Sequence, residues 1–170
     1  MRYILETERL FLREFSTEDA PFVVQLVNSP GWLEFIGDRN IRNDEQARIY
    51  LENGPLLSYK QNGYGLSLVE LKHGKTPIGM CGIINRENLE NPDIGFAFLP
   101  EHMGQGFAFE VAQATMKYAR ENLKLPTVCA ITVSGNLPSI KLLEKLGMKF
   151  SKMINFPDDP VELMLYRMDY

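Results

Sequence analysis

The sequence is poor in the residues that mark metal-binding proteins. It contains two cysteines, two histidines and one tryptophan in 170 residues. Cys81 and Cys129 lie far apart, one in each half of the chain, and do not have the spacing of a metal site. We therefore expect two buried, reduced thiols and no bound metal.

Long apolar runs and a basic charge excess are also missing. No apolar run approaches the roughly 20 residues needed to cross a bilayer, and the first residues, 1–6, do not resemble a signal peptide. The formal net charge is −4, whereas a protein that binds nucleic acid needs a concentrated basic face. We therefore expect a cytoplasmic protein that binds neither nucleic acid nor membrane.

The residues that are present have the composition of a globular protein, with 45% hydrophobic residues and no repeat or linker. A chain of this length can bury roughly 70% of its unfolded surface in one core without metals or disulfides. We expect a single domain over residues 1–170.

Hydrophobic periodicity predicts a strand, one or two helices, three strands, a helix, a strand, a helix and two strands. Segment 32–37 is a short helix or a packed loop, and its Trp32 is expected in the core, with a substrate-cleft wall as the alternative. The predicted strands are 5–15, 63–71, 78–84, 94–99, 127–133, 148–154 and 161–170. Helices are expected after the caps at 16–19 and 43–46, from Phe107, and over 137–146.

A glycine loop joins the strand 94–99 to the helix that begins at Phe107. Gly104 and Gly106 allow backbone N–H groups to approach a ligand, and the helix that follows offers free N–H donors and a positive dipole end. The loop is therefore a candidate phosphate site, with an ordinary tight connection as the alternative. It is not a P-loop, because Phe107 and Ala108 stand where Lys and Ser or Thr are required, and it lacks the third glycine of a Rossmann fingerprint.

Two segments at the expected separation, 103–108 and 136–148, resemble motifs of the GNAT superfamily of acyl-CoA-dependent N-acetyltransferases. The opening segment 6–13 resembles the branch typified by ribosomal-protein N-terminal acetyltransferases. The resemblance implies a single α+β domain whose mixed sheet has about seven strands, opened into a V, with four or so helices. It also implies acetyl-CoA as the acyl donor.

The resemblance implies a cofactor site built from three segments. In the pattern Gln/Arg-x-x-Gly-x-Gly/Ala, Gly106 and Ala108 match, Gly104 is the usual extra glycine, and Met103 replaces the Gln or Arg. The preceding strand would hydrogen-bond the pantetheine arm, Asn136 would contact that arm, and Ser139 would lie near the thioester sulfur. The implied cofactor-binding residues are Ala97, Phe98, Met103, Gly104, Gln105, Gly106, Phe107, Ala108, Asn136 and Ser139.

Acetyl transfer requires an amine that loses its proton and a thiolate that departs. Asp93, just ahead of the strand 94–99, stands where the resembled branch often carries a glutamate. The resemblance makes it a candidate base, directly or through water, if burial or neighbouring charge raises its pKa. A loop residue that ends a turn is the alternative. Leu143 stands where many GNAT enzymes carry a proton-donating tyrosine. Ser139 is therefore the candidate donor to sulfur, with backbone capping as the alternative. Glu110 is expected to be structural, in the first helical turn.

These features predict an acetyl-CoA-dependent N-acetyltransferase that acts on a primary amine by direct attack in a ternary complex. A catalytically inactive CoA-binding sensor or interaction module is the alternative, and a mononucleotide-binding protein is a third. The acceptor is open, from a peptide amino terminus to a small-molecule amine, and so is the choice between monomer and homodimer. Its pocket is expected where residues 30–64 meet the carboxyl-terminal strands.

Overall fold

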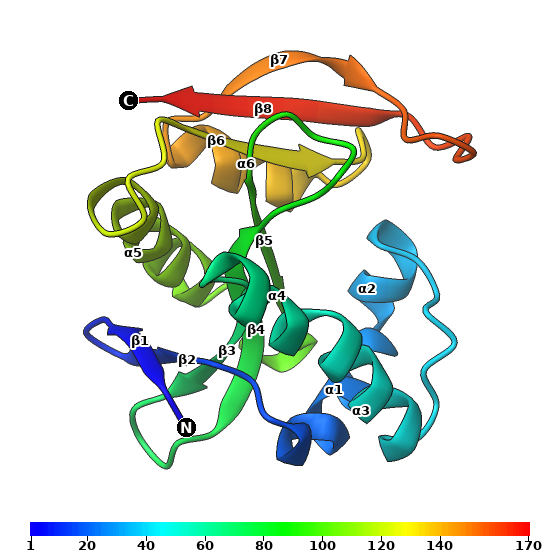
Figure 1. Ribbon diagram of the computed structural model, residues 1–170, viewed down its shortest axis with the longest axis vertical. Helices are drawn as coiled ribbons and strands as arrows, with labels where there is room; N and C mark the ends of the chain where they lie inside the picture. Colours follow the sequence, from blue (N-terminus) through cyan, green and yellow to red (C-terminus); the bar gives the residue numbers. More distant parts are fainter.

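The computed structural model describes residues 1–170 and contains one mixed sheet of eight strands (Figure 1). The strands lie side by side in the order β1-β2-β3-β4-β5-β6-β8-β7. Only β5 and β6 are parallel, and every other neighbouring pair is antiparallel. The strands are β1 (Tyr3–Glu6), β2 (Leu10–Arg13), β3 (Leu66–Leu71), β4 (Pro77–Ile84), β5 (Asp93–Phe98), β6 (Thr127–Thr132), β7 (Lys149–Ile154) and β8 (Leu163–Asp169).

Six α-helices and two short 3-10 helices, η1 and η2, surround the sheet. No helix is long and apolar enough to cross a membrane. The helices are η1 (Thr17–Asp19), α1 (Ala20–Val27), α2 (Pro30–Phe35), α3 (Asp44–Asn53), α4 (Pro55–Asn62), η2 (Pro100–His102), α5 (Phe107–Glu121) and α6 (Leu137–Lys145).

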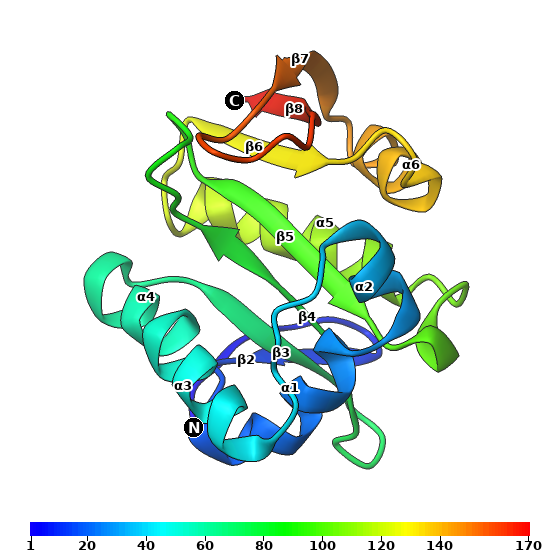
Figure 2. The same cartoon turned by 90° about the vertical axis from the view of Figure 1, so that its right-hand side faces the viewer.

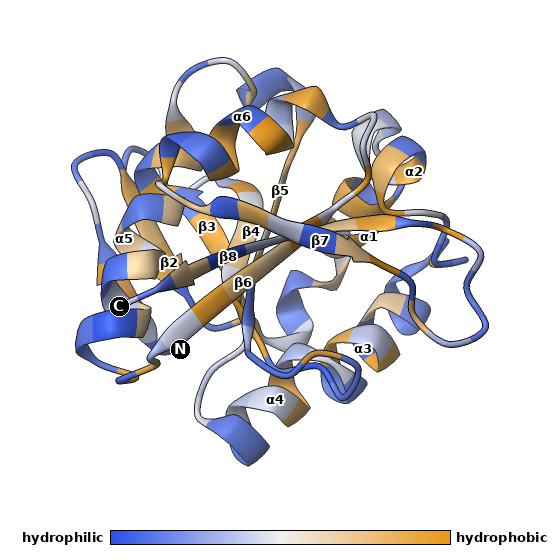
Figure 3. Cartoon of the chain, turned by 90° about the horizontal axis from the view of Figure 1, so that it is seen from above, coloured by the Kyte–Doolittle hydropathy of each residue, from blue (hydrophilic) through white to orange (hydrophobic).

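The sheet separates two hydrophobic cores because successive strand side chains point to opposite faces. Val69 and Phe98 enter the core that α5 and α6 cover, whereas their neighbours Leu68 and Leu99 enter the core formed with α1 and α3. Figure 3 shows α1 as mainly hydrophobic and most connecting loops as hydrophilic. Both cysteines are buried and unpaired, as expected.

The predicted strand 5–15 is in fact two strands joined by a turn. The Thr7 N–H donates to the Leu10 carbonyl at 2.9 Å, and the Leu10 N–H donates to Thr7 Oγ1 at 3.1 Å. The chain reverses there, and β1 pairs with β2 antiparallel. This reversal explains why the sheet has eight strands rather than about seven. The other predicted strands are confirmed, with small differences at their ends.

The segment between α1 and β3 holds more helix than its periodicity indicates. Most of segment 32–37, for which the sequence allows either a helix or a packed loop, belongs to α2. Trp32 is buried in the core, as expected. Asn43 caps α3, because its side chain accepts the Gln46 N–H at 2.9 Å. A separate helix, α4, follows Gly54. Figure 2 shows α3 and α4 next to each other, with α2 apart from them.

A buried ion-pair network holds the amino-terminal hairpin to the rest of the domain. Arg13 in β2 donates to Asp19 from both terminal nitrogens, at 2.9 and 2.8 Å, and from Nε to Glu70 in β3 at 3.1 Å. The Tyr3 hydroxyl also donates to Glu70, at 2.8 Å. Arg13 and Glu70 are 5% and 3% exposed, so each charge depends on its partner.

The sheet splits between β5 and β6. The two parallel strands are in register only at Asp93 and Cys129, where the Cys129 N–H donates to the Pro92 carbonyl at 2.8 Å. Beyond that pair the strands diverge, and β6 continues into α6 while β5 continues into the glycine loop (Figure 2). The expected V-shaped opening is therefore present, with its closed end at Asp93.

Candidate active site

The glycine loop presents an unbroken row of free backbone donors. Gly104 and Gly106 have φ values of +74° and +83°, so the chain passes twice through the left-handed region that favours glycine. The N–H groups from Gly104 to Phe109 have no acceptor anywhere in the protein. Six successive N–H groups that end in the first turn of a 15-residue helix form a concave site suited to an anion.

Glu110 connects the first turn of α5 to the turn between β1 and β2. Its Oε1 accepts the Thr7 hydroxyl at 2.6 Å and the Arg9 N–H at 2.9 Å, and its Oε2 accepts Arg9 Nε at 2.7 Å. The structural role expected for Glu110 agrees with these contacts.

Arg9 was not singled out from the sequence, yet its side chain lies against the glycine loop. Its Nη1 donates to the Gln105 carbonyl at 3.0 Å, and its guanidinium carbon lies 4.3 Å from the centre of the Phe107 ring. No local pattern could have revealed this contact, because Arg9 and Gln105 are 96 residues apart.

The edge of β5 that faces the opening can be read from its pairing with β4. The Leu99 N–H donates to the Ile78 carbonyl at 2.9 Å, and the register is regular along the whole pair. Since alternate residues direct their backbone groups to opposite sides, Ala97 bonds to β4, whereas Phe96 and Phe98 face the opening. The backbone groups of the predicted Phe98, and of Phe96, which the sequence motifs do not single out, are therefore free of β4, whereas those of the predicted Ala97 are bonded to it.

The other side of the opening carries the second predicted motif. Asn136 is the N-cap of α6, and its Oδ1 accepts the Ser139 N–H at 3.3 Å. The Ser139 hydroxyl makes no hydrogen bond within the protein, so Asn136, rather than Ser139, caps the helix. Leu143, which stands where many enzymes of the resembled family carry a tyrosine, is buried in the core. Its side chain is a hydrocarbon and cannot donate a proton.

Asp93 lies at the closed end of the opening and is 1% exposed. Burial raises the pKa of its carboxyl, and Arg86, whose Nε donates to Oδ1 at 2.9 Å, partly opposes that increase. The pKa of Asp93 is therefore shifted upward, which is the direction that a general base requires. Asp93 lies where β5 and β6 meet, whereas Ser139 lies on the helix that follows β6.

Two other predicted loop residues make contacts that leave the backbone donors free. The Met103 side chain is 52% exposed, and its terminal carbon lies 3.7 Å from where a Cβ would stand on Gly31 in α2. The Gln105 amide donates to the Glu101 carbonyl at 3.0 Å. The side chain that replaces the family's Gln or Arg therefore points to α2.

A cavity of about 250 Å³ lies between α3, α4 and the ends of β3 and β4. Ile84, which pairs with Asp93 across the sheet, forms part of its wall. Its polar lining contains amides and hydroxyls but no charged side chain, and it includes no residue of β7 or β8. The polar side chains are Tyr50, Asn53, Ser58, Gln61, Asn62 and Asn85.

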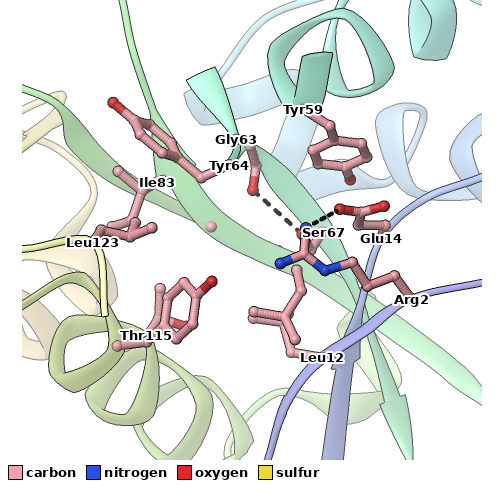
Figure 4. Close-up of a pocket in the computed structure, with 14 residues that line it drawn as sticks. Arg2, Leu12, Glu14, Tyr59, Gly63, Tyr64, Ser67, Ile83, Thr115 and Leu123 are labelled. Carbon is pink, nitrogen blue, oxygen red and sulfur yellow. Dashed lines mark hydrogen bonds and ion pairs between the residues drawn. The ribbon is translucent and has the colours of Figure 1, made fainter. Parts of the chain in front are cut away.

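A smaller cavity lies on the other face of the sheet, beside α5 (Figure 4). Tyr59, Thr115 and Leu123 form part of its wall. Its volume of about 20 Å³ is enough for a water molecule. It is too small for an acyl acceptor, whereas the cavity of about 250 Å³ beside α3 and α4 can hold a small polar molecule and is our candidate acceptor pocket.

Comparison with known proteins agrees with this geometry. Residues 9–149 match the Acetyltransferase (GNAT) domain family. The chain is 32% identical over 147 residues to an N-acetyltransferase called p20 from Bacillus licheniformis, a match that covers 85% of this chain and 82% of that protein.

Solved structures share this fold. An acetyltransferase from Agrobacterium tumefaciens superposes with a TM-score of 0.83 at 25% identity, covering 100% of this chain and 95% of the other. RimL, a ribosomal L7/L12 α-N-protein acetyltransferase solved with coenzyme A, superposes with a TM-score of 0.82 at 18% identity, covering 99% and 98%.

The chain therefore belongs to the GNAT family of acetyltransferases. It is an N-acetyltransferase of that family, and enzymes of this family use acetyl-CoA as the acyl donor.

Proposed function

We propose that this protein binds acetyl-CoA in the opening between β5 and β6 and transfers its acetyl group to a primary amine in a ternary complex. The observation that carries the proposal is the row of six free N–H groups at the start of α5, next to a strand edge without a partner. Such a row suits the pyrophosphate of CoA, and the strand edge suits its amide-containing arm.

The fit can be assigned residue by residue. The phosphates would lie on the backbone N–H groups of the glycine loop, and the arm would run along β5 beside Phe96 and Phe98. The strand from Asp93 to Phe98 is roughly 17 Å long at about 3.3 Å per residue. An extended arm that starts at the loop therefore runs toward Asp93 at the closed end.

Asp93 and the Ser139 hydroxyl supply the proton chemistry. Acetyl-CoA supplies an activated acyl group on a thiol leaving group. Asp93 would accept the amine proton, directly or through a water, because burial raises the pKa of its carboxyl toward that of a useful base. The Ser139 hydroxyl, which is not used in capping, would donate a hydrogen bond to sulfur as negative charge develops there.

The acceptor would enter from the larger cavity. That cavity adjoins the strand paired with Asp93, and its amide lining suits a polar molecule such as a peptide amino terminus or a small-molecule amine. An α-amine, with a reference pKa of about 7.7 to 8.0, needs less help from a base than a lysine amine at about 10.4.

A catalytically inactive CoA-binding module is the second candidate. Two departures favour it: Met103 lacks the polar contact of the family pattern, and Leu143 cannot donate a proton. It differs from the enzyme in one measurable respect, because it would bind CoA without turnover.

The test combines binding with turnover. Thermal unfolding is followed with acetyl-CoA, CoA, ATP or NAD added separately, each at about one hundred times the dissociation constant of a micromolar ligand, which is about 0.1 mM. Specific binding at that ratio adds about 2.7 kcal/mol, or roughly 5 to 11 °C for a domain of this size. A panel of amines with acetyl-CoA is then analysed by mass spectrometry.

We expect both CoA compounds to raise Tm, the two nucleotides to have no effect, and at least one amine to gain an acetyl group. Stabilisation by CoA without an acetylated product across peptides, polyamines, amino acids and aminoglycosides would favour the inactive module. An absence of stabilisation by CoA would reject both.

A further inference from the structure

We propose that Arg9 is a positioning residue that sets the affinity of the glycine loop for CoA. The inference rests on the proposed function, because it concerns the same loop. Arg9 is the charged side chain that contacts both the loop backbone, at Gln105, and the carboxylate beside it, at Glu110.

The first step of the argument is the orientation of one peptide group. The Gln105 carbonyl accepts Arg9 Nη1 at 3.0 Å. In a planar trans peptide the C=O and N–H bonds point in opposite directions. Holding the Gln105 carbonyl on the Arg9 side therefore turns the N–H of Gly106, which belongs to the same peptide, to the other side of the loop. Without that anchor, two glycines give this peptide enough freedom to turn over.

The second step concerns charge. Glu110 places a carboxylate in the first turn of α5, close to the row of N–H groups that would bind phosphate. An unpaired carboxylate there would repel an anionic ligand. Arg9 Nε binds Glu110 Oε2 at 2.7 Å, so the pair presents little net charge to the loop.

The third step is that Arg9 is itself held in place. Its carbonyl accepts the Lys72 N–H at 2.9 Å, and its N–H donates to Glu110, so both backbone groups are fixed. The guanidinium packs over the Phe107 ring at 4.3 Å, and Nη2 would lie 3.3 Å from a Cβ on Gly106. Arg9 uses two separate nitrogens of a planar group, Nε for Glu110 and Nη1 for Gln105. A lysine has a single nitrogen and cannot reproduce that geometry.

The experiment measures the Kd of CoA by calorimetry, together with the KM of acetyl-CoA and kcat, in four variants of the whole protein. These are Arg9→Ala, Arg9→Lys, the double variant Arg9→Ala with Glu110→Gln, and Arg120→Ala as a matched control. Arg120 lies near the other end of α5 and also packs on an aromatic ring, at 5.2 Å from the centre of Tyr170.

We expect Arg9→Ala to raise Kd and KM about tenfold, the loss typical of a charge-assisted hydrogen bond, with kcat at saturation little changed. Arg9→Lys should behave like Arg9→Ala, and Arg120→Ala like the wild type. The double variant should recover part of the affinity, because it no longer carries the unpaired carboxylate. Arg9 is partly exposed, and Tm without ligand confirms that each variant is folded.

An unchanged Kd in folded Arg9→Ala would overturn the inference while leaving the proposed function in place. So would a fall in kcat without a change in Kd or KM, or a double variant weaker than Arg9→Ala. Failure of the wild type to bind CoA would instead overturn the proposed function, and this inference with it.

Discussion

Asp93, the proposed base, combines three properties. It is buried, it begins the strand at which the sheet opens, and its Oδ1 has a cationic partner in Arg86. Burial disfavours the charged carboxylate and Arg86 favours it, so the two effects oppose each other and burial prevails. A general base needs such a balance, because a carboxyl at its ordinary pKa of about 3.9 is too weak.

The pH dependence of kcat tests this role. If Asp93 is the base, kcat falls as pH decreases through its raised pKa, because the protonated form cannot accept a proton. Asp93→Asn should lower kcat about a hundredfold, at the lower end of what a general base contributes, and should remove that limb while leaving the Kd of CoA unchanged. Arg86→Gln should move the limb to higher pH, because a charge that favours the carboxylate is lost.

An acidic limb that persists in Asp93→Asn, or that Arg86→Gln moves to lower pH, would assign the limb to another group.

The raised pKa of Asp93 also determines how its contribution to stability changes with pH. Because the fold favours protonated Asp93, its contribution to the free energy of unfolding decreases as pH rises from about 3.9, the unfolded value, through its raised folded pKa.

At the scale of elements, the amino-terminal hairpin contacts the glycine loop region at its turn and the rest of the domain at its other end. Its turn carries Arg9 and Thr7 to the start of α5, and its second strand carries Arg13 to Asp19 and Glu70. The hairpin therefore links the glycine loop to the helices on the opposite face of the sheet.

Replacing Arg13 tests how far the fold depends on that link. Arg13→Ala leaves two carboxylates without their buried partner, which typically costs about 3 to 5 kcal/mol. The expected fall in Tm is roughly 6 to 20 °C for a domain of this size. Arg48→Ala is the control, because its ion pair with Glu45 is exposed and should contribute less than about 1 kcal/mol. Equal falls in the two variants would contradict a structural role for the Arg13 network.

Sequence patterns predicted most of the elements, because the strands alternate and the caps and glycines lie at element ends. They missed the reversal within 5–15, since Thr7 stabilises a turn inside an otherwise alternating run. They also identified the glycine loop and the cap at Asn136. They could not identify Arg9 or the strand edge at Phe96, because each depends on register or on packing between distant segments. They placed a pocket beside residues 30–64, which include α3 and α4, but the cavity there is completed by β3 and β4 rather than by the carboxyl-terminal strands.

At the scale of the whole molecule, the sheet consists of two parts that share a single register pair. The strands β1 to β5 form one part and β6 to β8 the other, and they meet at Asp93 and Cys129. In the proposed complex, CoA would bond to the β5 edge of the first part, and the second part would contact it through α6, which follows β6.

Amide hydrogen exchange by NMR tests this arrangement at single residues. In the free protein the N–H groups of Phe96 and Phe98 face the opening and should exchange faster than that of Ala97, which bonds to β4. Saturating CoA should slow exchange at Phe96 and Phe98 by about tenfold or more and change Ala97 much less. Uniform protection along β5 would indicate global stabilisation alone, and no protection would place the arm elsewhere.

The burial of both cysteines determines which activity assay can be used with this protein. Burial raises the pKa of Cys81 to about 12 and also raises the pKa of Cys129, and it shields both sulfur atoms, so we expect both thiols to react slowly with disulfide reagents near neutral pH. A coloured thiol reagent added to the native protein would therefore report free CoA with almost no background. Acetyl transfer to untested amines could be followed continuously, without labelled substrate and without removing a cysteine.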